Sequence, residues 1–146
     1  MCSSRLFAQK HHTKLHINIF NGGKIAGSAV KFAKFYLIVD GTEANGSVDI
    51  TEAFIKFIQN VRKTVQTAKS GEAAFKPGVE GVYFNAFASI NETFKVIEDA
   101  IAASGANNEG RKLFRIGINC EGESYFNKDP KDPNKYEVEG AKNQHD

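Results

Sequence analysis

The spacing of apolar residues changes repeatedly along this chain, and that change limits the folds that it can adopt. From Leu15 to Phe20, apolar and polar residues alternate, which is the period of a strand. Between Phe54 and Val65, the apolar residues instead recur at helical spacing, with charged and polar residues between them. A chain that passes repeatedly from one period to the other forms layers of helices on a sheet, so we predict the α/β class.

The expected elements follow one another in the order strand, strand, helix, strand, helix, strand. The third strand is rich in glycine and could equally be a loop, and an edge strand at Tyr136–Val138 could follow the last one. The late alternation of strand, helix and strand indicates a parallel sheet with helices on its outside. The strands are expected at 15–20, 32–39, 79–87 and 113–120, and the helices at 49–70 and 89–105.

Polar residues mark where both helices begin. Asp49 or Thr51 can accept the free amide protons of the first helix, which Ser70-Gly71 would end. Ser89 and Glu92 have the spacing of a capping box at the start of the second helix. The sequence therefore predicts both helices from their ends as well as from their apolar faces.

Length and charge exclude several classes of protein. The 146 residues fit one domain, which we place at residues 15–140 between an N-terminal tail, 1–14, and a frayed tail, 141–146. A net charge of +2 is too weak to indicate a nucleic-acid or anionic-membrane partner, and no apolar run is long enough to cross a bilayer. Two cysteines, Cys2 and Cys120, make no disulfide framework, so we expect reduced thiols in the cytoplasm.

Three segments, in the right order, resemble the C-terminal barrel domain of enolase, the glycolytic phosphopyruvate hydratase. The run from Ile17 to Gly23, followed by Ala26-Gly27, is similar to the family's FNVINGGSHAG strand and loop. The run Gly78 to Gly81 resembles the GDEGG strand end. The run Arg115 to Cys120, with Ser124-Tyr125-Phe126 and Lys135-Tyr136 after it, resembles KIGMDVAASEFY and the KYDLDF hairpin.

This resemblance implies a fold and a reaction. The fold would be about the first half of an enolase-type TIM barrel, β-β-α-β-α-β with a C-terminal hairpin. The reaction would convert 2-phosphoglycerate to phosphoenolpyruvate with Mg²⁺, and it needs a base, an acid and metal ions that hold the charge of the enolic intermediate. The family's other metal carboxylates, its lysine base and its phosphate ligands belong to segments that this sequence does not contain.

The resemblance also shows which catalytic residue types have changed. Lys24-Ile25 stand where the family has Ser-His, and isoleucine cannot exchange a proton. Lys34 stands at the glutamate of the family's QEF motif, so a carboxylate has become an ammonium. Asn119 stands at the first magnesium-binding aspartate, where a neutral amide oxygen supplies no negative charge. Glu80 matches the glutamate of GDEGG and is the one catalytic group retained.

Each of these residues also has a plainer interpretation, which we favour. Glu80 could be a catalytic acid or an inherited residue at a strand end. Lys24 and Lys34 could bind a phosphate next to Gly22-Gly23, or they could be solvated lysines. Asn119 could be a weak Mg²⁺ ligand, or it could form a hydrogen bond to a neighbouring loop.

Two functions follow from these alternatives. One is a catalytically silent enolase-like protein that acts as an interaction or structural part. The other is a piece of an active, Mg²⁺-dependent phosphopyruvate hydratase completed by other chains or missing segments.

Four barrel strands alone would have open edges and an exposed apolar layer, containing residues such as Phe35, Leu37, Leu113, Phe114 and Ile118. We therefore expect a homo-oligomer or pairing with another enolase-type chain.

Overall fold

The computed structural model describes residues 14–43, 48–68, 80–85, 87–126 and 136. Two long helices, α2 (Ile50–Ala68) and α3 (Ile90–Ser104), pack on a sheet of four strands. Its strands are β1 (Lys14–Asn21), β2 (Lys34–Asp40), β3 (Tyr83–Phe84) and β6 (Phe114–Asn119). A small hairpin of β4 (Asn107–Asn108) and β5 (Arg111–Lys112) precedes β6, and short helical turns are α1 (Gly23–Ala26), η2 (Gly41–Glu43) and η4 (Gly122–Tyr125).

The sheet is mixed, in the order β3-β1-β2-β6, so the prediction of a parallel sheet is wrong for most of its pairs. β1 pairs with β2 and β2 pairs with β6 in antiparallel fashion, whereas β1 and β3 are parallel. The physical reason lies in the connections. Between β1 and β2 the chain contains only the short helix α1, so β2 returns beside β1 in the opposite direction. The longer connection from β3 to β6 contains α3, and β3 and β6 run in the same direction.

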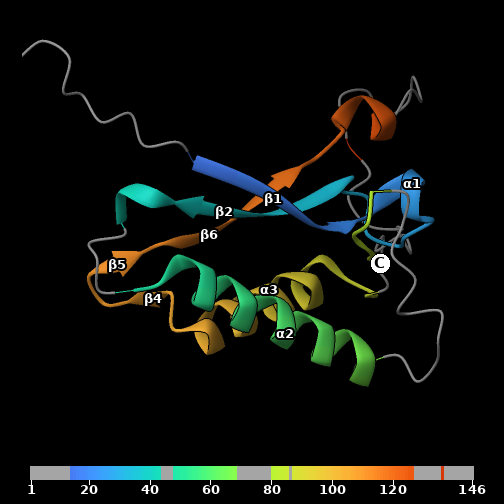
Figure 1. The fold of residues 1–146 in the computed structure, drawn as a ribbon. Coiled ribbons are helices and arrows are strands. Elements are labelled where there is room, and N and C mark those ends of the chain that lie inside the picture. Colours follow the sequence, from blue (N-terminus) through green and yellow to red (C-terminus); the bar gives the residue numbers. More distant parts are fainter. Residues whose placement is uncertain (1–13, 44–47, 69–79, 86, 127–135, 137–146) are drawn as a thin grey trace, which may run out of the picture.

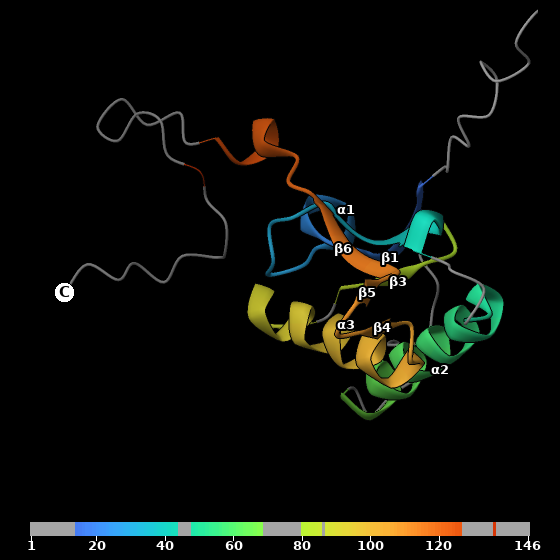
Figure 2. The same ribbon diagram turned by 90° about the vertical axis from the view of Figure 1, so that its left-hand side faces the viewer.

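Helices α2 and α3 both lie on one face of the sheet (Figures 1 and 2). Alternate side chains of the strands point toward them and form the core with the inner faces of the helices. Phe57 of α2 packs edge to face on Phe114 of β6, with ring centroids 6.0 Å apart. The fully buried large side chains of this layer include Phe20, Phe35, Leu37, Phe57, Val61, Ile97, Leu113 and Phe114.

The expected exposure of an apolar layer is therefore wrong for most of the residues named. Phe35 and Leu37 of β2 and Leu113 before β6 are completely buried, and Phe114 is 1% exposed. The reason is that the apolar side of the strands faces the two helices rather than an empty barrel interior. Ile118, at the end of β6, is the exception, because 40% of it is exposed.

Both predicted helix starts are confirmed. The carboxylate of Asp49 accepts hydrogen bonds from the backbone N–H of Thr51 and of Glu52, at 2.8 and 3.2 Å. The hydroxyl of Ser89 accepts from the N–H of Glu92 at 3.2 Å, and α3 ends at Gly105 in the left-handed conformation. The expected end of α2 at Ser70-Gly71 lies outside the described residues.

The remaining expectations are met in part. The third strand is only Tyr83–Phe84, shorter than the predicted 79–87, whose residues 79 and 86 are not described. Of the C-terminal hairpin, an antiparallel bridge between Phe126 and Tyr136 is described, and residues 127–135 and 137–146 lie outside the described part, as do residues 1–13 of the N-terminal tail. Among the described helices, none combines the length and apolar character that crossing a membrane requires.

Candidate functional site

The polar residues that the sequence marks as chemically interesting gather on the face of the sheet that α2 and α3 leave uncovered. Lys34 begins β2, and its register partners are Asn21 at the end of β1 and Asn119 at the end of β6. β1 and β6 run in the same direction, so their carboxyl ends meet here. In sheets of the α/β class, ligands and catalytic residues are found at this edge, which makes it the candidate site.

Glu80, which lies three residues before β3, joins this cluster through an ion pair. The Nζ of Lys34 lies 2.6 Å from its Oε1 and 2.9 Å from its Oε2. The side-chain amide of Asn18, on β1, donates to Oε2 of Glu80 at 2.9 Å and to Oδ1 of Asn21 at 2.8 Å. The structure thus brings Glu80 and Lys34 into direct contact.

The ion pair favours the charged form of both groups. The hydrogen bond from Lys34 lowers the pKa of the Glu80 carboxyl below its ordinary value, against the opposing effect of desolvation. The same hydrogen bond raises the pKa of the Lys34 ammonium. At neutral pH Glu80 is therefore an anion without a proton to donate, and Lys34 is a cation.

Asn119 lies beside this pair but turns its side-chain oxygen toward its own loop. Its Oδ1 accepts from the backbone N–H of Glu121 at 3.1 Å, and Glu121 has a left-handed backbone with φ of 46°. This hydrogen bond supports the sharp turn that ends β6. One lone pair of the oxygen that would face a cation is therefore already occupied.

Lys24 has a different set of partners from Lys34. Its backbone N–H donates to the hydroxyl of Tyr125 at 2.7 Å, and its ammonium lies 5.6 Å from the centroid of that ring, as that of Lys31 does at 5.8 Å. A Cβ on Gly23, which has φ of 59°, would collide with the Tyr125 hydroxyl. The glycine turn after β1 thus makes room for Tyr125.

Sequence reasoning gave no role to Asn18 or Tyr125. Asn18 lies in the strand with its side chain on the uncovered face, and alternation from Ile17 and Ile19 could have placed it there. The contact of Tyr125 with Lys24 of α1 joins residues that are 101 positions apart in the sequence, so no local pattern could have revealed it. Ile25, at the position of the family's histidine, lies in α1.

The residues at this site do not fit a magnesium ion. Within the described ranges, no group of three or more histidine, cysteine, aspartate or glutamate side chains is placed to hold a metal. Magnesium prefers carboxylate and water oxygens in an octahedron. The carboxylate of Glu80 already binds an ammonium, and the side chain of Asn119 is neutral.

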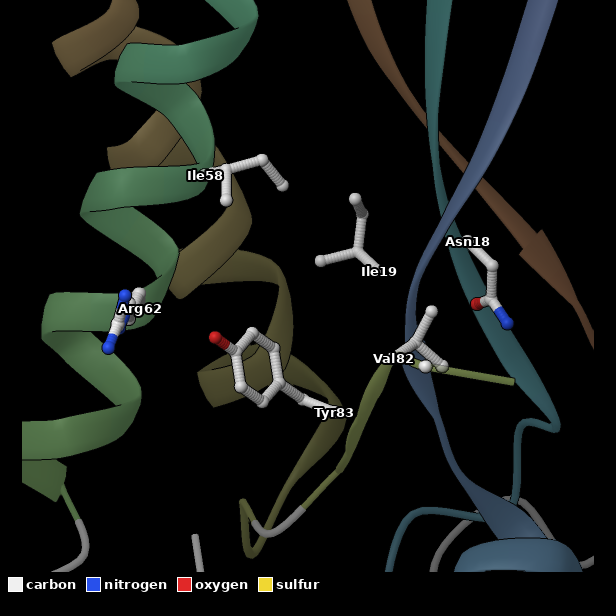
Figure 3. A pocket seen from close by; sticks show the side chains of 7 residues that line it. Asn18, Ile19, Ile58, Arg62, Val82 and Tyr83 are labelled. Carbon is white, nitrogen blue, oxygen red and sulfur yellow. The ribbon is translucent and has the colours of Figure 1, made fainter. Parts of the chain in front are cut away.

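A cavity of about 360 Å³ lies next to the cluster, between α2 and the segment that leads into β3 (Figure 3). Asn18 borders it on one side, and Arg62 and Tyr83 border it on the other. The remaining lining is mainly apolar, contributed by residues such as Ile19, Ile58 and Val82. The sequence gave no indication of this cavity, since its lining comes from three separate segments.

Comparison with known proteins identifies the family. The family model described as the enolase C-terminal TIM barrel domain matches residues 14–146 of this chain. The chain belongs to the enolase family. The open mixed sheet, with two helices on one face, is consistent with part of that barrel, and the described part of the chain forms no closed barrel.

Two curated proteins that are similar to this chain are named enolase. The chain is 30% identical over 127 residues to the enolase of Methanococcus aeolicus, a match that covers 86% of this chain and 27% of the relative. It is 30% identical over 93 residues to the enolase of Methanococcus vannielii, covering 64% and 21%. The chain thus spans about a quarter of the length of these enolases.

Proposed function

We propose that this chain is an enolase-family protein that does not catalyse the lyase reaction and that acts as an interaction or structural part. The observation that carries the proposal is the ion pair between Lys34 and Glu80. These are the positions that match the glutamates of the QEF and GDEGG motifs. Where the family motifs have two carboxylates, this chain has one ammonium and one carboxylate, whose charges cancel.

The chemistry of the reaction gives this change its weight. Loss of the hydroxyl from 2-phosphoglycerate needs a group that assists its departure, and magnesium ions must stabilise the enolic intermediate. The Lys34 ammonium further favours the ionised form of Glu80, which has no proton to give. The positive charge of the Lys34 ammonium also repels a metal cation from the Glu80 carboxylate.

The two other exchanges act in the same direction. Asn119 brings no negative charge, and its side-chain oxygen accepts a hydrogen bond from Glu121. Ile25 replaces a histidine and has no titratable group. Proton transfer and metal binding are therefore weakened at separate positions, which a single compensating contact would not restore.

A spectrophotometric assay tests the proposal. The purified 146-residue chain, incubated with 2-phosphoglycerate and Mg²⁺, should form no phosphoenolpyruvate above the rate without protein. The matched control is Glu80→Gln, which should give the same background. Turnover that depends on Mg²⁺ and disappears in Glu80→Gln would overturn the proposal, since it would show Glu80 at work in catalysis.

A further inference from the structure

The carboxylate of Glu80 is surrounded by hydrogen-bond donors in the way that a bound anion is. The Nζ of Lys34 on β2 donates to both of its oxygens, at 2.6 and 2.9 Å. The side-chain amide of Asn18 on β1 donates to Oε2 at 2.9 Å. An ammonium and an amide at these distances are partners that a carboxylate ligand would have. The chain therefore supplies both a carboxylate and the donors that bind it.

The orientation of Asn18 indicates that its amide serves this carboxylate. Its Nδ2 donates to Glu80 and to the Oδ1 of Asn21, a side chain that is only 1% exposed. Its own Oδ1 is buried and has no hydrogen-bond partner among the residues that the structure describes. A buried acceptor without a partner is unfavourable, but turning the amide over would bring this oxygen against the oxygens of Asn21 and Glu80. The amide thus directs its donor toward the anion.

The donors do not depend on Glu80 for their positions. Lys34 and Asn21 are register partners in the paired strands β1 and β2, and Asn21 holds the amide of Asn18. The side chain of Lys34 is 23% exposed, whereas that of Glu80 is 47% exposed, so the carboxylate lies on the solvent side of the ammonium. Donors that are fixed before an anion arrives favour its binding.

We propose that Lys34 and Asn18 form a carboxylate-binding site and that Glu80 occupies this site as an internal ligand. Removal of the Glu80 side chain opens the site to a small monocarboxylate such as acetate. In the wild-type chain the internal carboxylate is present at an effective concentration on the order of millimolar or more, so it keeps external carboxylates from the same donors. The inference rests on the proposed function in one respect, that an anion-binding pair stands where the family motifs have two carboxylates.

An acetate titration of Glu80→Ala tests the site. This substitution removes a methylene and a carboxylate, which acetate replaces atom for atom. The full-length, ¹⁵N-labelled variant is titrated at neutral pH, with chloride keeping the ionic strength constant. The side-chain amide signals of Asn18 should shift and saturate, and the thermal unfolding midpoint should rise with acetate and level off. The wild-type chain should show neither change.

Three further variants separate a specific site from a general effect of anions. Glu80→Gln fills the same space with an uncharged amide, so it should not respond to acetate. Lys34→Gln/Glu80→Ala lacks the ammonium and should not respond either. Lys56→Gln/Glu80→Ala is the matched control, because Lys56 is an exposed lysine of α2 that pairs with Glu52. It should respond as Glu80→Ala does, and circular dichroism establishes which variants are folded.

Several results would overturn the inference. These are no saturable shift in Glu80→Ala, an equal response in the wild-type chain, or an equal response in Lys34→Gln/Glu80→Ala. If Glu80→Ala is unfolded in chloride, acetate should restore its fold, and a variant that stays unfolded in saturating acetate would also overturn it. Lyase turnover of the wild-type chain is a separate measurement. Turnover together with acetate binding in the variant would contradict the proposed function alone, whereas a silent chain whose variant ignores acetate would contradict this inference alone.

Discussion

The two faces of the β1-β2-β6 sheet are organised by different forces. The face toward α2 and α3 is a continuous apolar layer, in which side chains such as Leu37 and Phe57 are completely buried. The opposite face carries polar side chains joined by a few ion pairs, among them Lys34 with Glu80 and Lys14 with Asp40. The covered face thus stabilises the fold, whereas the uncovered face presents the residues that a reaction would use.

This difference explains how the chain can keep an enolase-type fold while its site residues change. Burial of apolar area is non-directional, so many apolar sequences fill the covered face. A catalytic site depends on single groups of defined charge, and one exchange from carboxylate to ammonium alters it. The following predictions test the contrast, beginning with the largest expected effect.

Truncation of the covered face should have the largest effect on stability. Phe57 is completely buried and contacts Phe114, so Phe57→Ala should reduce the free energy of unfolding by about 3–5 kcal/mol. Ile55 lies on the exposed side of the same helix, so Ile55→Ala should reduce the free energy of unfolding far less. Urea denaturation followed by circular dichroism measures both, and similar losses would contradict the placement of the core.

Asp40 should produce a stability change that depends on pH. Hydrogen bonds from Thr42 and Lys14 lower the pKa of its carboxyl to about 2, from an ordinary 3.8. Because the unfolded chain takes up the proton at the higher pH, this contribution is present above about pH 4 and is lost as the pH falls toward 2. Asp40→Asn should be less stable at neutral pH and converge with the wild type in acid; parallel curves would count against the contacts.

Removal of the α3 cap should have a smaller effect. Ser89→Ala loses the hydroxyl that accepts from the N–H of Glu92, at a cost of about 1 kcal/mol in the free energy of unfolding. Thr67→Ala, in the exposed last turn of α2, is the control and should cost nothing measurable. Equal losses in the two variants would show that the effect is not capping.

Magnesium should have the smallest effect of all. Since Lys34 occupies the carboxylate of Glu80, binding should be no tighter than the roughly 10⁻⁴–10⁻³ M of the weakest calcium sites. Mg²⁺ at about 10⁻⁵ M, well below these dissociation constants, should therefore leave the thermal unfolding midpoint unchanged. Isothermal calorimetry that reports stoichiometric, micromolar binding to the wild-type chain would refute this expectation.

The sequence predicts most of the covered face and little of the uncovered one. Both helices and their caps at Asp49 and Ser89 follow from local patterns, because the apolar period and the cap residue lie within one segment. The pairing of β6 with β2 does not, since the choice of strand partner depends on how distant segments pack. The α/β class could be predicted, but the mixed sheet could not.

The candidate site divides in the same way. Resemblance to the enolase motifs singled out Glu80, Lys34 and Asn119, and the structure brings Glu80 and Lys34 together with Asn119 beside Lys34. The ion pair itself joins residues 46 positions apart, so it could be found only from their positions in space. The contact of Tyr125 with α1 was missed for the same reason.

The state of the Glu80 carboxyl is the most direct test of this account. A carboxyl-carbon NMR titration of the wild-type chain should give Glu80 a pKa below that of an ordinary glutamate, and Lys34→Gln should raise it. This result would show that Lys34 stabilises the ionised form of Glu80. A pKa at or above the ordinary value, unchanged in Lys34→Gln, would contradict the ion pair.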